Sequence, residues 1–257
     1  MDLLFNKVGH AESHINFREY IDSVFAENQE VYDWLLHTVG WTPNKIRKMS
    51  SGVDLDDLQP KPRPKFLVDK YDIKESDLVV GFSGRLSEEK GPEIFVKVAK
   101  LFEGTSNLRF VMTGAGPMST ELQKQIQLLS PNIKFEFAGL VEDVKPYLAL
   151  YDILIVPSKV DGRPLVIMEA FACGVPVIAS NVGGLPELIE EGCNGYLVQS
   201  GNATAFASKI QELAANSPML ELLKVGARSF AANRLDAKKS YREYDLALRD
   251  LVGEINS

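Results

Sequence analysis

Two cations follow the first strongly apolar run of the sequence. Arg85 and Lys90 lie in the stretch GFSGRLSEEKG, residues 81–91, behind a run that stops at Gly84, and a proline then begins a helical segment. Glycine permits a ligand to approach the backbone closely, and a helix start has free N–H groups, so a loop of this kind favours an anion. A single arginine or lysine is more often a solvated surface charge, so the loop needs independent support.

Carboxylates occur in a second loop, within the stretch PSKVDGRPLVIMEAFACG at residues 157–174. Asp161 lies on this loop, Gly162 and Pro164 open a helix, and Glu169 lies more than one turn into that helix. Two carboxylates in these places could accept hydrogen bonds from several hydroxyl groups of a sugar.

The helix of this second loop has two properties that bear on a binding site. Its start leaves N–H groups free near Leu165 and Val166, which favour negative charge in the space before them. Glu169 could be an ordinary surface acid, but its neighbours in residues 167–172 are apolar. An acid within an apolar helix needs a partner, which argues against the surface interpretation.

A third loop, NVGGLPE at residues 181–187, has paired glycines and a proline near a helix start. Simple turn chemistry explains it as well as a functional role does. All three loops follow predicted strands, and ligands of open α/β sheets bind in the crevice at the carboxyl ends of the strands. Their expected convergence on one sheet edge is stronger evidence for a site than any one loop.

The elements that must position these loops are short β-rich runs that alternate with helical segments between residues 77 and 198. The runs are rich in β-branched or aromatic residues and end in glycine, proline or serine, which is typical of parallel strands buried on both faces. Six runs fit this description: residues 78–82, 108–112, 133–137, 153–156, 175–179 and 196–198. They predict a doubly wound parallel α/β sheet of Rossmann-like type.

The two ends of the chain differ from this core. From Ala203 onward the sequence predicts a C-terminal helical extension of three segments, at residues 203–215, 218–232 and 236–252. Residues 16–38 are helical or mixed, and they are followed by a proline alternation that favours an extended linker, at Pro60, Pro62 and Pro64. We therefore place a domain boundary at about residue 60, between residues 1–60 and residues 61–257.

The composition is that of an ordinary globular protein. The chain has 257 residues, of which 45% are hydrophobic and 25% charged, and 28 basic against 35 acidic residues give a net charge of −7. An acidic chain without a basic block is a poor candidate for binding nucleic acid or an anionic membrane. No apolar run approaches the roughly 20 residues of a transmembrane helix, and the first residues do not form a secretory signal, so we expect a cytoplasmic protein.

Several stretches resemble the carboxyl-terminal, donor-binding half of GT-B glycosyltransferases, of the retaining family 4 type that is also called glycogen-synthase-like. The resemblance extends from about residue 25 to the end of the chain, and the order and spacing of its motifs argue against chance agreement. It rests on SSGVDLDDLQP (51–60), GFSGRLSEEKGPEIFVKVA (81–99), FVMTGAGPM (110–118), FEFAGLVEDVKPYLALYDILIVPS (135–158) and DGRPLVIMEAFACGVPVIASNVGGLPELIEEGCNGYLV (161–198).

The resemblance implies roles for four candidate catalytic residues. Arg85 and Lys90 match the basic pair that neutralises the diphosphate of the donor. Glu169 matches the last acid of the family's E-x7-E motif, which usually holds the ribose hydroxyls. Asp161 takes the place of the first acid, normally a glutamate near the donor sugar, so its reach is one methylene shorter. The expected donor contacts also include Gly84, Gly114, Leu140, Val141, Gly162, Arg163, Pro164, Leu165 and Val166, with Gly116 beside Gly114 on the pocket floor.

The implied reaction transfers a sugar with retention, from a nucleoside diphosphate sugar to a saccharide or lipid-linked acceptor. UDP-sugar is the expected donor, with GDP-sugar and ADP-sugar as alternatives. Two cations and a helix N-terminus can stabilise the departing diphosphate without a metal ion, so we expect no metal and no cofactor. The triplet Asp54–Leu55–Asp56 looks like a metal motif of another glycosyltransferase fold but precedes the core, and His10 and His14 lack a third ligand nearby.

A GT-B enzyme has two Rossmann-like domains, and the first binds most of the acceptor. About 20 residues precede residues 21–28, which correspond to the last strand and turn of that first domain, whereas a domain needs roughly 100–150 residues. We therefore expect residues 1–60 to be a remnant of the acceptor domain with the interdomain linker, and residues 61–257 to bind the nucleotide sugar. Such a fragment binds donor but transfers poorly, and the missing N-terminal domain could attach the parent enzyme peripherally to a membrane.

Two other function classes compete with this interpretation. A nucleotide-dependent oxidoreductase fits poorly, because GAGPMS at residues 114–119 lacks the last glycine of the dinucleotide motif and follows the second strand instead of the first. A non-catalytic nucleotide-sugar-binding module remains the main alternative. The retained Arg85, Lys90 and Glu169 argue against it, and the missing half argues for it.

Overall fold

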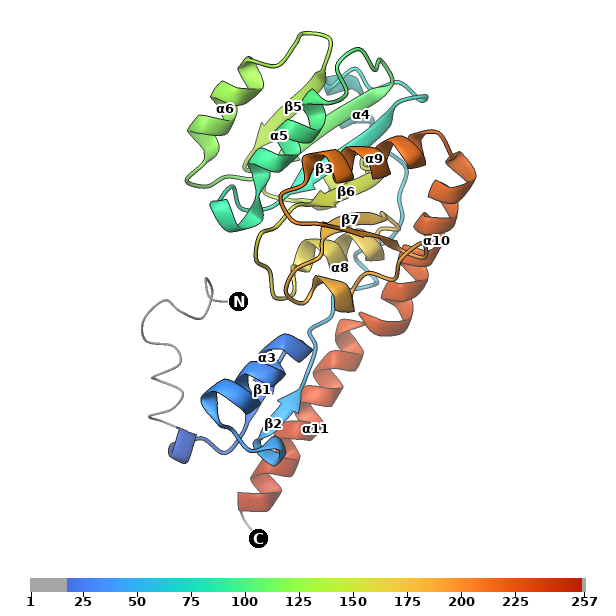
Figure 1. Ribbon diagram of the computed structural model, residues 1–257. Coiled ribbons are helices and arrows are strands. Elements are labelled where there is room, and N and C mark those ends of the chain that lie inside the picture. The colour runs from blue at the N-terminus through green and yellow to red at the C-terminus, as the bar shows by residue number, and fades with distance from the viewer. Residues whose placement is uncertain (1–17, 256–257) are drawn as a thin grey trace.

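A computed structural model describes residues 18–255 of the chain. Its main body is a six-stranded parallel sheet in the order β5-β4-β3-β6-β7-β8 (Figure 1). The strands are β3 (Leu78–Ser83), β4 (Leu108–Thr113), β5 (Lys134–Gly139), β6 (Ile153–Val156), β7 (Val177–Ser180) and β8 (Gly195–Val198). Each of the six predicted runs therefore forms a strand, and the doubly wound parallel α/β fold is confirmed.

The direction in which the sheet grows reverses at β3. The chain adds β4 and β5 on one side of β3, then returns and adds β6, β7 and β8 on the other side. The loops after β3 and β6 are therefore neighbours at the carboxyl edge of the sheet. Open α/β sheets bind their ligands at such a reversal, because loops that run in opposite directions leave a crevice between them.

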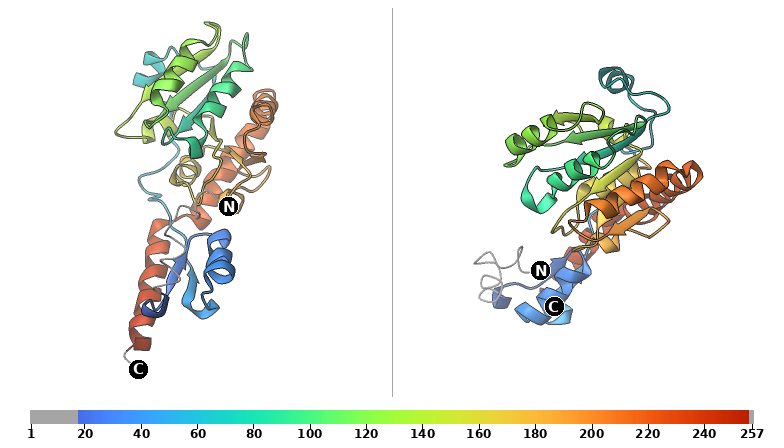
Figure 2. Two further views of the ribbon diagram at one scale, coloured as in Figure 1. Left: turned by 60° about the vertical axis from the view of Figure 1, so that its left-hand side comes forward. Right: turned by 45° about the horizontal axis from the view of Figure 1, so that its top comes forward.

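Helices cover both faces of the sheet (Figures 1 and 2). One hydrophobic cluster joins Val80 of β3 to α5 (Pro92–Lys100), α6 (Ser119–Gln127) and α9 (Ala203–Ala214). The other joins Val79 to α4 (Lys65–Lys70), α7 (Lys145–Leu148), α8 (Leu165–Ala172) and α10 (Ser217–Arg234). Consecutive residues of a strand point to opposite faces, so one apolar run supplies both layers.

Residues 18–49 form a small unit with its own core, in the lower part of Figure 1. Strands β1 (Val24–Ala26) and β2 (Ile46–Lys48) pair in parallel. The unit also contains η1 (Arg18–Tyr20), α3 (Gln29–Trp34), the π-helical η2 (Leu35–Val39) and the 3-10 turn η3 (Pro43–Lys45). The sequence predicted helical or mixed structure for residues 16–38 and the strand that is now β1, but it predicted neither β2 nor α4.

The C-terminal helix α11 (Ala237–Ile255) lies along this small unit, away from the main sheet (Figures 1 and 2). The rings of Tyr244 and Phe25 contact each other with centroids 5.3 Å apart, and Arg47 pairs with Asp250 at 3.6 Å. Helices α9, α10 and α11 match the three segments of the predicted C-terminal extension.

The chain passes between the main sheet and the small unit twice, and both passages meet at one place. Val53 N donates to Leu235 O at 2.8 Å, and Ala237 N donates to Val53 O at 3.0 Å. The contact at Gly52 is close, since a Cβ there would lie 2.6 Å from Leu235 O. The division into residues 1–60 and 61–257 stays a prediction.

The most buried ion pair of the sheet gives a stability prediction. Arg109 of β4 donates to Asp77 at 2.7 Å, and these side chains are 7% and 2% exposed. Asp77→Ala should lower the free energy of unfolding by about 3 kcal/mol, because it leaves a buried guanidinium without its partner. Asp69→Ala is the control, since it removes a surface pair with Lys65 and should change stability by less than about 0.5 kcal/mol. Urea unfolding of both variants measures the difference, and equal effects would contradict the prediction.

Candidate functional site

Two adjoining cavities open at the carboxyl edge of the sheet, beside the start of α8. Their volumes are about 320 and 470 Å³, and both are lined by Ser83, Gly84, Leu165 and Val166. Lys90, Asp161, Arg163 and Pro164 also line the smaller cavity, whereas Arg85, Gly114, Leu140, Val141 and Glu169 also line the larger one. Of the contact residues predicted from the sequence, Gly162 and Gly116 line neither cavity.

Glycines bring the loops after β3 and β4 into contact at the cavity floor. Gly114 has a φ of 134°, and a Cβ there would lie 1.8 Å from Gly84 O. No side chain fits at this position, because both the backbone conformation and the space require glycine. Gly116, predicted to share the pocket floor, instead packs beneath the loop, where a Cβ would lie 2.4 Å from Leu86 O.

An ion pair joins the loops that follow β3 and β6. Lys90 Nζ lies 2.7 Å from Asp161 Oδ2, and Ser158 Oγ donates to the same oxygen at 3.0 Å. The Asp161 side chain is only 6% exposed, whereas that of Lys90 is 31% exposed and reaches the smaller cavity. The sequence predicted that both residues belong to one site but missed Ser158, whose only signal is a hydroxyl two residues after the end of a strand.

The backbone of these two loops is also held together. Lys159 N donates to Glu89 O at 2.8 Å. Gly91 has a φ of 63°, and a Cβ there would lie 2.3 Å from Pro157 O, so glycine is required where the two loops approach most closely. The position of Lys90 beside Asp161 is therefore set by the backbone as well as by charge.

Arg85 differs from Lys90 in having no carboxylate to pair with. Its side chain is exposed and lines the larger cavity. Among residues 18–255, none forms a hydrogen bond or ion pair with its guanidinium group. Arg85 therefore brings to the larger cavity a positive charge that no ion pair holds, as an anion-binding residue would. A hydrogen bond from Ser87 lowers the pKa of Glu89, and the charge of Arg85 helps to lower it.

Glu169 lies at the far side of the larger cavity, in an apolar surrounding that includes Val141 and Val144. Burial raises the pKa of its carboxyl group above the ordinary range, and the nearby charge of Asp143 raises it further. A carboxylate held in an apolar place without a cation is typical of a binding or catalytic group.

Arg163 lies on the loop that carries Asp161, near the charge of Glu27 in the small unit. Burial lowers the pKa of its guanidinium group, and the charges of Glu187 and Glu27 oppose that shift. Its Nε atom is buried without a hydrogen-bond partner. Arg163 thus lines the smaller cavity from the side of the N-terminal unit.

The third predicted loop supports the site without lining either cavity. Gly184 N donates to Asp161 O at 3.1 Å. A Cβ at Gly183 would lie 1.9 Å from Asp161 O, and a Cβ at Gly184 would lie 1.9 Å from Gly162 O. Gly183 and Gly184 therefore form a notch that receives the backbone of the Asp161 loop. The sequence indicated a turn here but not this close contact.

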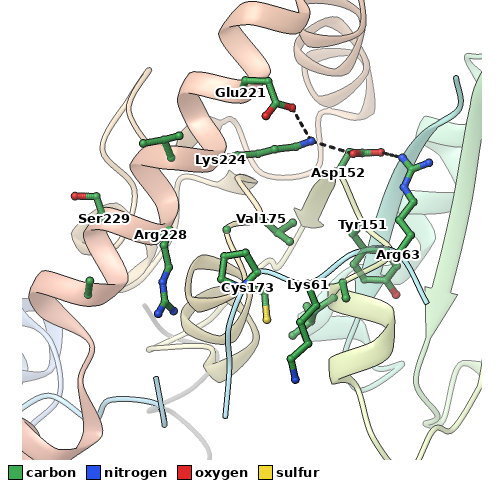
Figure 3. A pocket seen from close by; sticks show the side chains of 16 residues that line it. Lys61, Arg63, Tyr151, Asp152, Cys173, Val175, Glu221, Lys224, Arg228 and Ser229 are labelled. Atoms are coloured by element: carbon green, nitrogen blue, oxygen red, sulfur yellow. Dashed lines mark hydrogen bonds and ion pairs between the residues drawn. The ribbon is translucent and has the colours of Figure 1, made fainter. Parts of the chain in front are cut away.

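A larger cavity, of about 660 Å³, lies at the opposite edge of the sheet (Figure 3). Asp152 accepts hydrogen bonds there from Arg63 of the linker, from Lys224 of α10 at 3.1 Å, and from Val79 N at 2.9 Å. Lys224 also pairs with Glu221 at 2.9 Å. These charges hold the linker against the sheet and α10, so we assign them to the architecture.

The carboxylates of the Asp54–Asp56 triplet have partners of their own. Asp54 Oδ1 accepts hydrogen bonds from Asp56 N at 2.9 Å and Asp57 N at 3.2 Å, which lower the pKa of Asp54, and Asp56 pairs with Lys238 at 2.5 Å. Neither aspartate lines the two cavities. Within residues 18–255 no group of three or more His, Cys, Asp or Glu side chains has the arrangement of a metal site, and His10 and His14 lie outside these residues.

A family model described as glycosyl transferases group 1 matches residues 65–230. The chain belongs to this family. The D-inositol 3-phosphate glycosyltransferase 1 of Catenulispora acidiphila is 30% identical over 223 residues, which are 82% of this chain and 53% of that protein. The chain spans about half the length of the curated relatives that it matches.

Solved structures show the same fold. The Anabaena protein HepE in complex with UDP has a TM-score of 0.87 and 22% identity, over 96% of this chain and 70% of HepE. The C-terminal domain of LpcC, a group 1 family protein from Francisella tularensis, has a TM-score of 0.65 and 24% identity, over 72% of this chain and 99% of that domain. The resemblance to the C-terminal half of GT-B glycosyltransferases is therefore confirmed. In residues 18–255, no helix is both long and apolar enough to cross a membrane.

The raised pKa of Glu169 gives a prediction about stability and pH. Because the folded state binds this proton more tightly than the unfolded state, the stability linked to Glu169 is present below its ordinary pKa and is lost as pH rises through the raised pKa. Glu169→Gln, which mimics the protonated group, should therefore raise Tm at pH 7 and should lose that advantage at acidic pH. Thermal unfolding between pH 4 and pH 8 measures the effect.

The matched control is Glu103→Gln, which changes an exposed acid after α5. It should leave Tm unchanged across the same pH range. A Glu169→Gln variant that is no more stable than this control at pH 7 would contradict the prediction.

Proposed function

We propose that this chain is the donor-binding half of a retaining glycosyltransferase, which takes a sugar from a nucleoside diphosphate sugar and transfers it to a saccharide or lipid-linked acceptor. UDP-sugar is the expected donor, with GDP-sugar and ADP-sugar as alternatives. One observation carries the proposal: two adjoining cavities are surrounded by charged groups and a helix start. These are the unpaired cation Arg85, the ion pair of Lys90 with Asp161, the start of α8, and the carboxylate of Glu169 in its apolar surrounding.

The charges of this site suit the departure of a diphosphate. As the glycosidic bond breaks, the leaving group gains negative charge, and groups that already point at it stabilise the transition state most. Arg85 is free for a phosphate, and Lys90 can share its ammonium group between Asp161 and a phosphate oxygen. The free N–H groups at the start of α8 add positive potential, so the reaction needs neither a metal ion nor another cofactor.

The carboxylates would bind the hydroxyl groups of the donor. Glu169 would accept hydrogen bonds from the ribose, beside the base at Leu140 and Val141. Asp161 lies on the other side of the phosphate position and would accept from the transferred sugar. HepE, which shares this fold, binds UDP and UDP-glucose in its crystal structures, which supports a uridine nucleotide as the first donor to test.

The acceptor would bind largely on an N-terminal domain like that of the relatives, of which this chain spans about half the length. We place the reaction in the cytoplasm, with any membrane contact made through that domain. The alternative is a non-catalytic nucleotide-sugar-binding module. Such a module would bind UDP-sugar and never release UDP from it, so assaying UDP release by a protein that includes both halves separates the two functions.

Binding calorimetry with UDP, GDP and ADP tests the donor site of this chain. We expect UDP to bind most tightly and its affinity to be the same with and without EDTA. Arg85→Ala and Lys90→Ala should each weaken UDP binding by about 10- to 100-fold, since each removes a charge-assisted hydrogen bond. Lys97→Ala, an exposed lysine of α5, is the control and should bind as the unchanged chain does. No binding of any of the three nucleotides would refute the proposal.

Glu169→Gln separates the nucleoside contact from the phosphate contacts. The variant should bind both UDP and uridine about tenfold more weakly, because an amide NH2 replaces one of the two oxygens that accept from the ribose and the negative charge is lost. Arg85→Ala should instead leave uridine binding unchanged. Equal uridine affinity in the Glu169 variant and the unchanged chain would remove Glu169 from the nucleoside site.

A further inference from the structure

Asn28 reaches from the small unit to the loop that carries Asp161. Its Oδ1 atom accepts a hydrogen bond from Val31 N at 2.8 Å, which caps the start of α3. Its Nδ2 atom donates to Gly162 O at 3.0 Å, across 134 residues of sequence. The residue is only 1% exposed, so both bonds are shielded from competing water.

The carbonyl that Asn28 binds belongs to a loop that is held on two sides. Gly184 N donates to Asp161 O at 3.1 Å, and the next carbonyl along the chain, Gly162 O, receives Asn28 Nδ2. A Cβ at Gly184 would lie 2.7 Å from Asn28 Nδ2, so the amide, the loop and the notch are packed against one another. Because the carbonyls of Asp161 and Gly162 each accept a hydrogen bond, from Gly184 and from Asn28, the peptide that joins these two residues has little freedom to rotate.

The side chain of Asp161 depends on this backbone. Its carboxylate pairs with Lys90 at 2.7 Å and accepts from Ser158 at 3.0 Å, and both contacts require the loop to stay in place. A rotation of the peptide that Asn28 holds would move the Asp161 carboxylate, whereas Lys90 lies on a different loop, whose backbone is fixed at Gly91. The effect of Asn28 on the cavity is therefore indirect, through Gly162.

A second contact joins the small unit to the same region. Glu187 accepts from Gln29 N at 2.5 Å and pairs with Lys48 at 3.3 Å. Gln29 directly follows Asn28, and Glu187 follows the paired glycines of the notch. The small unit thus contacts both the Asp161 loop and the segment that holds it.

We infer that Asn28 is a positioning residue, through which the small unit of residues 18–49 sets the Asp161 loop for the sugar of the donor. This inference rests on the proposed function of the cavities. Its consequence is specific: loss of the Asn28 bond to Gly162 weakens recognition of the sugar while the contacts to the nucleotide, at Arg85 and Glu169, are unchanged.

Two variants remove the bond to the loop and retain the helix cap. Asn28→Asp and Asn28→Ser both leave an oxygen that accepts from Val31 N, and all three residues are good N-caps. Neither can donate to Gly162 O as the amide does. The matched control is Asn202→Asp at the start of α9, where Oδ1 of Asn202 accepts from Ala205 N at 3.0 Å and the residue lines neither cavity.

The first measurement is hydrogen exchange in the unliganded chain. Gly184 N–H donates to Asp161 O, so its exchange rate reports whether the loop stays in the notch. We expect Gly184 to exchange faster in Asn28→Asp and Asn28→Ser than in Asn202→Asp. This measurement requires no donor and therefore does not depend on the proposed function.

The second measurement is the ratio of the affinities for UDP-glucose and UDP. We expect both Asn28 variants to bind UDP-glucose about 3- to 10-fold more weakly, the effect of one lost hydrogen bond, and to bind UDP as the control does. A general loss of stability would instead weaken both ligands alike. The ratio therefore distinguishes positioning of the loop from a structural defect.

The results that would overturn the inference differ from those that would overturn the proposed function. Asn28 variants that match Asn202→Asp in exchange or in the affinity ratio refute the role of Asn28, whereas the cavities remain a donor site. If the unchanged chain binds neither UDP nor UDP-glucose, the proposed function fails, and the claim that Asn28 sets the loop for a donor sugar fails with it.

Discussion

The ion pair of Lys90 and Asp161 is the interaction on which the candidate site depends. It joins the loops after β3 and β6, which meet because the growth of the sheet reverses between these strands. A nearly buried carboxylate is stable only with a cation and further donors, and Lys90 and Ser158 supply both. The close approach at Gly91 holds these two loops together, and the glycine notch and the bond from Asn28 hold the Asp161 loop from its other side.

The site retains charge in places where burial opposes it. Burial disfavours the charged form of Glu169 at one end and of Arg163 at the other, so the pKa values of the two groups shift in opposite directions. A sequence selected for stability alone would place apolar residues there. Charged groups that are retained although their burial costs stability indicate function, because a bound ligand can supply the hydrogen-bond or charge partner that the protein does not.

The sequence predicted the sheet and most of the site because both have local signals. Apolar runs that end in glycine, proline or serine mark buried strands, and loops after such strands must lie at one edge of the sheet. The strand β2 has no such signal, since Ile46 is the only apolar residue among its three. Ser158 acts through a loop conformation that brings its hydroxyl to Asp161, and Asn28 acts through Gly162, which is 134 residues away. The pairing of Lys90 with Asp161 depends on backbone contacts at Gly91. Such tertiary effects are visible only in three dimensions.

The hydrogen bonds that join Val53 to Leu235 and Ala237 limit how the small unit can move. Because both covalent connections pass through this one point, the unit cannot shift away without breaking both bonds. It can turn about this point only when the contacts of Asn28 with Gly162 and of Gln29 with Glu187 are broken. Helix α11 extends from this point as a lever of 19 residues, or about 28 Å at 1.5 Å per residue. A turn of only about 10° would move the far end of this lever by about 5 Å. Small angular changes at the pivot thus become large displacements at the far end of the unit.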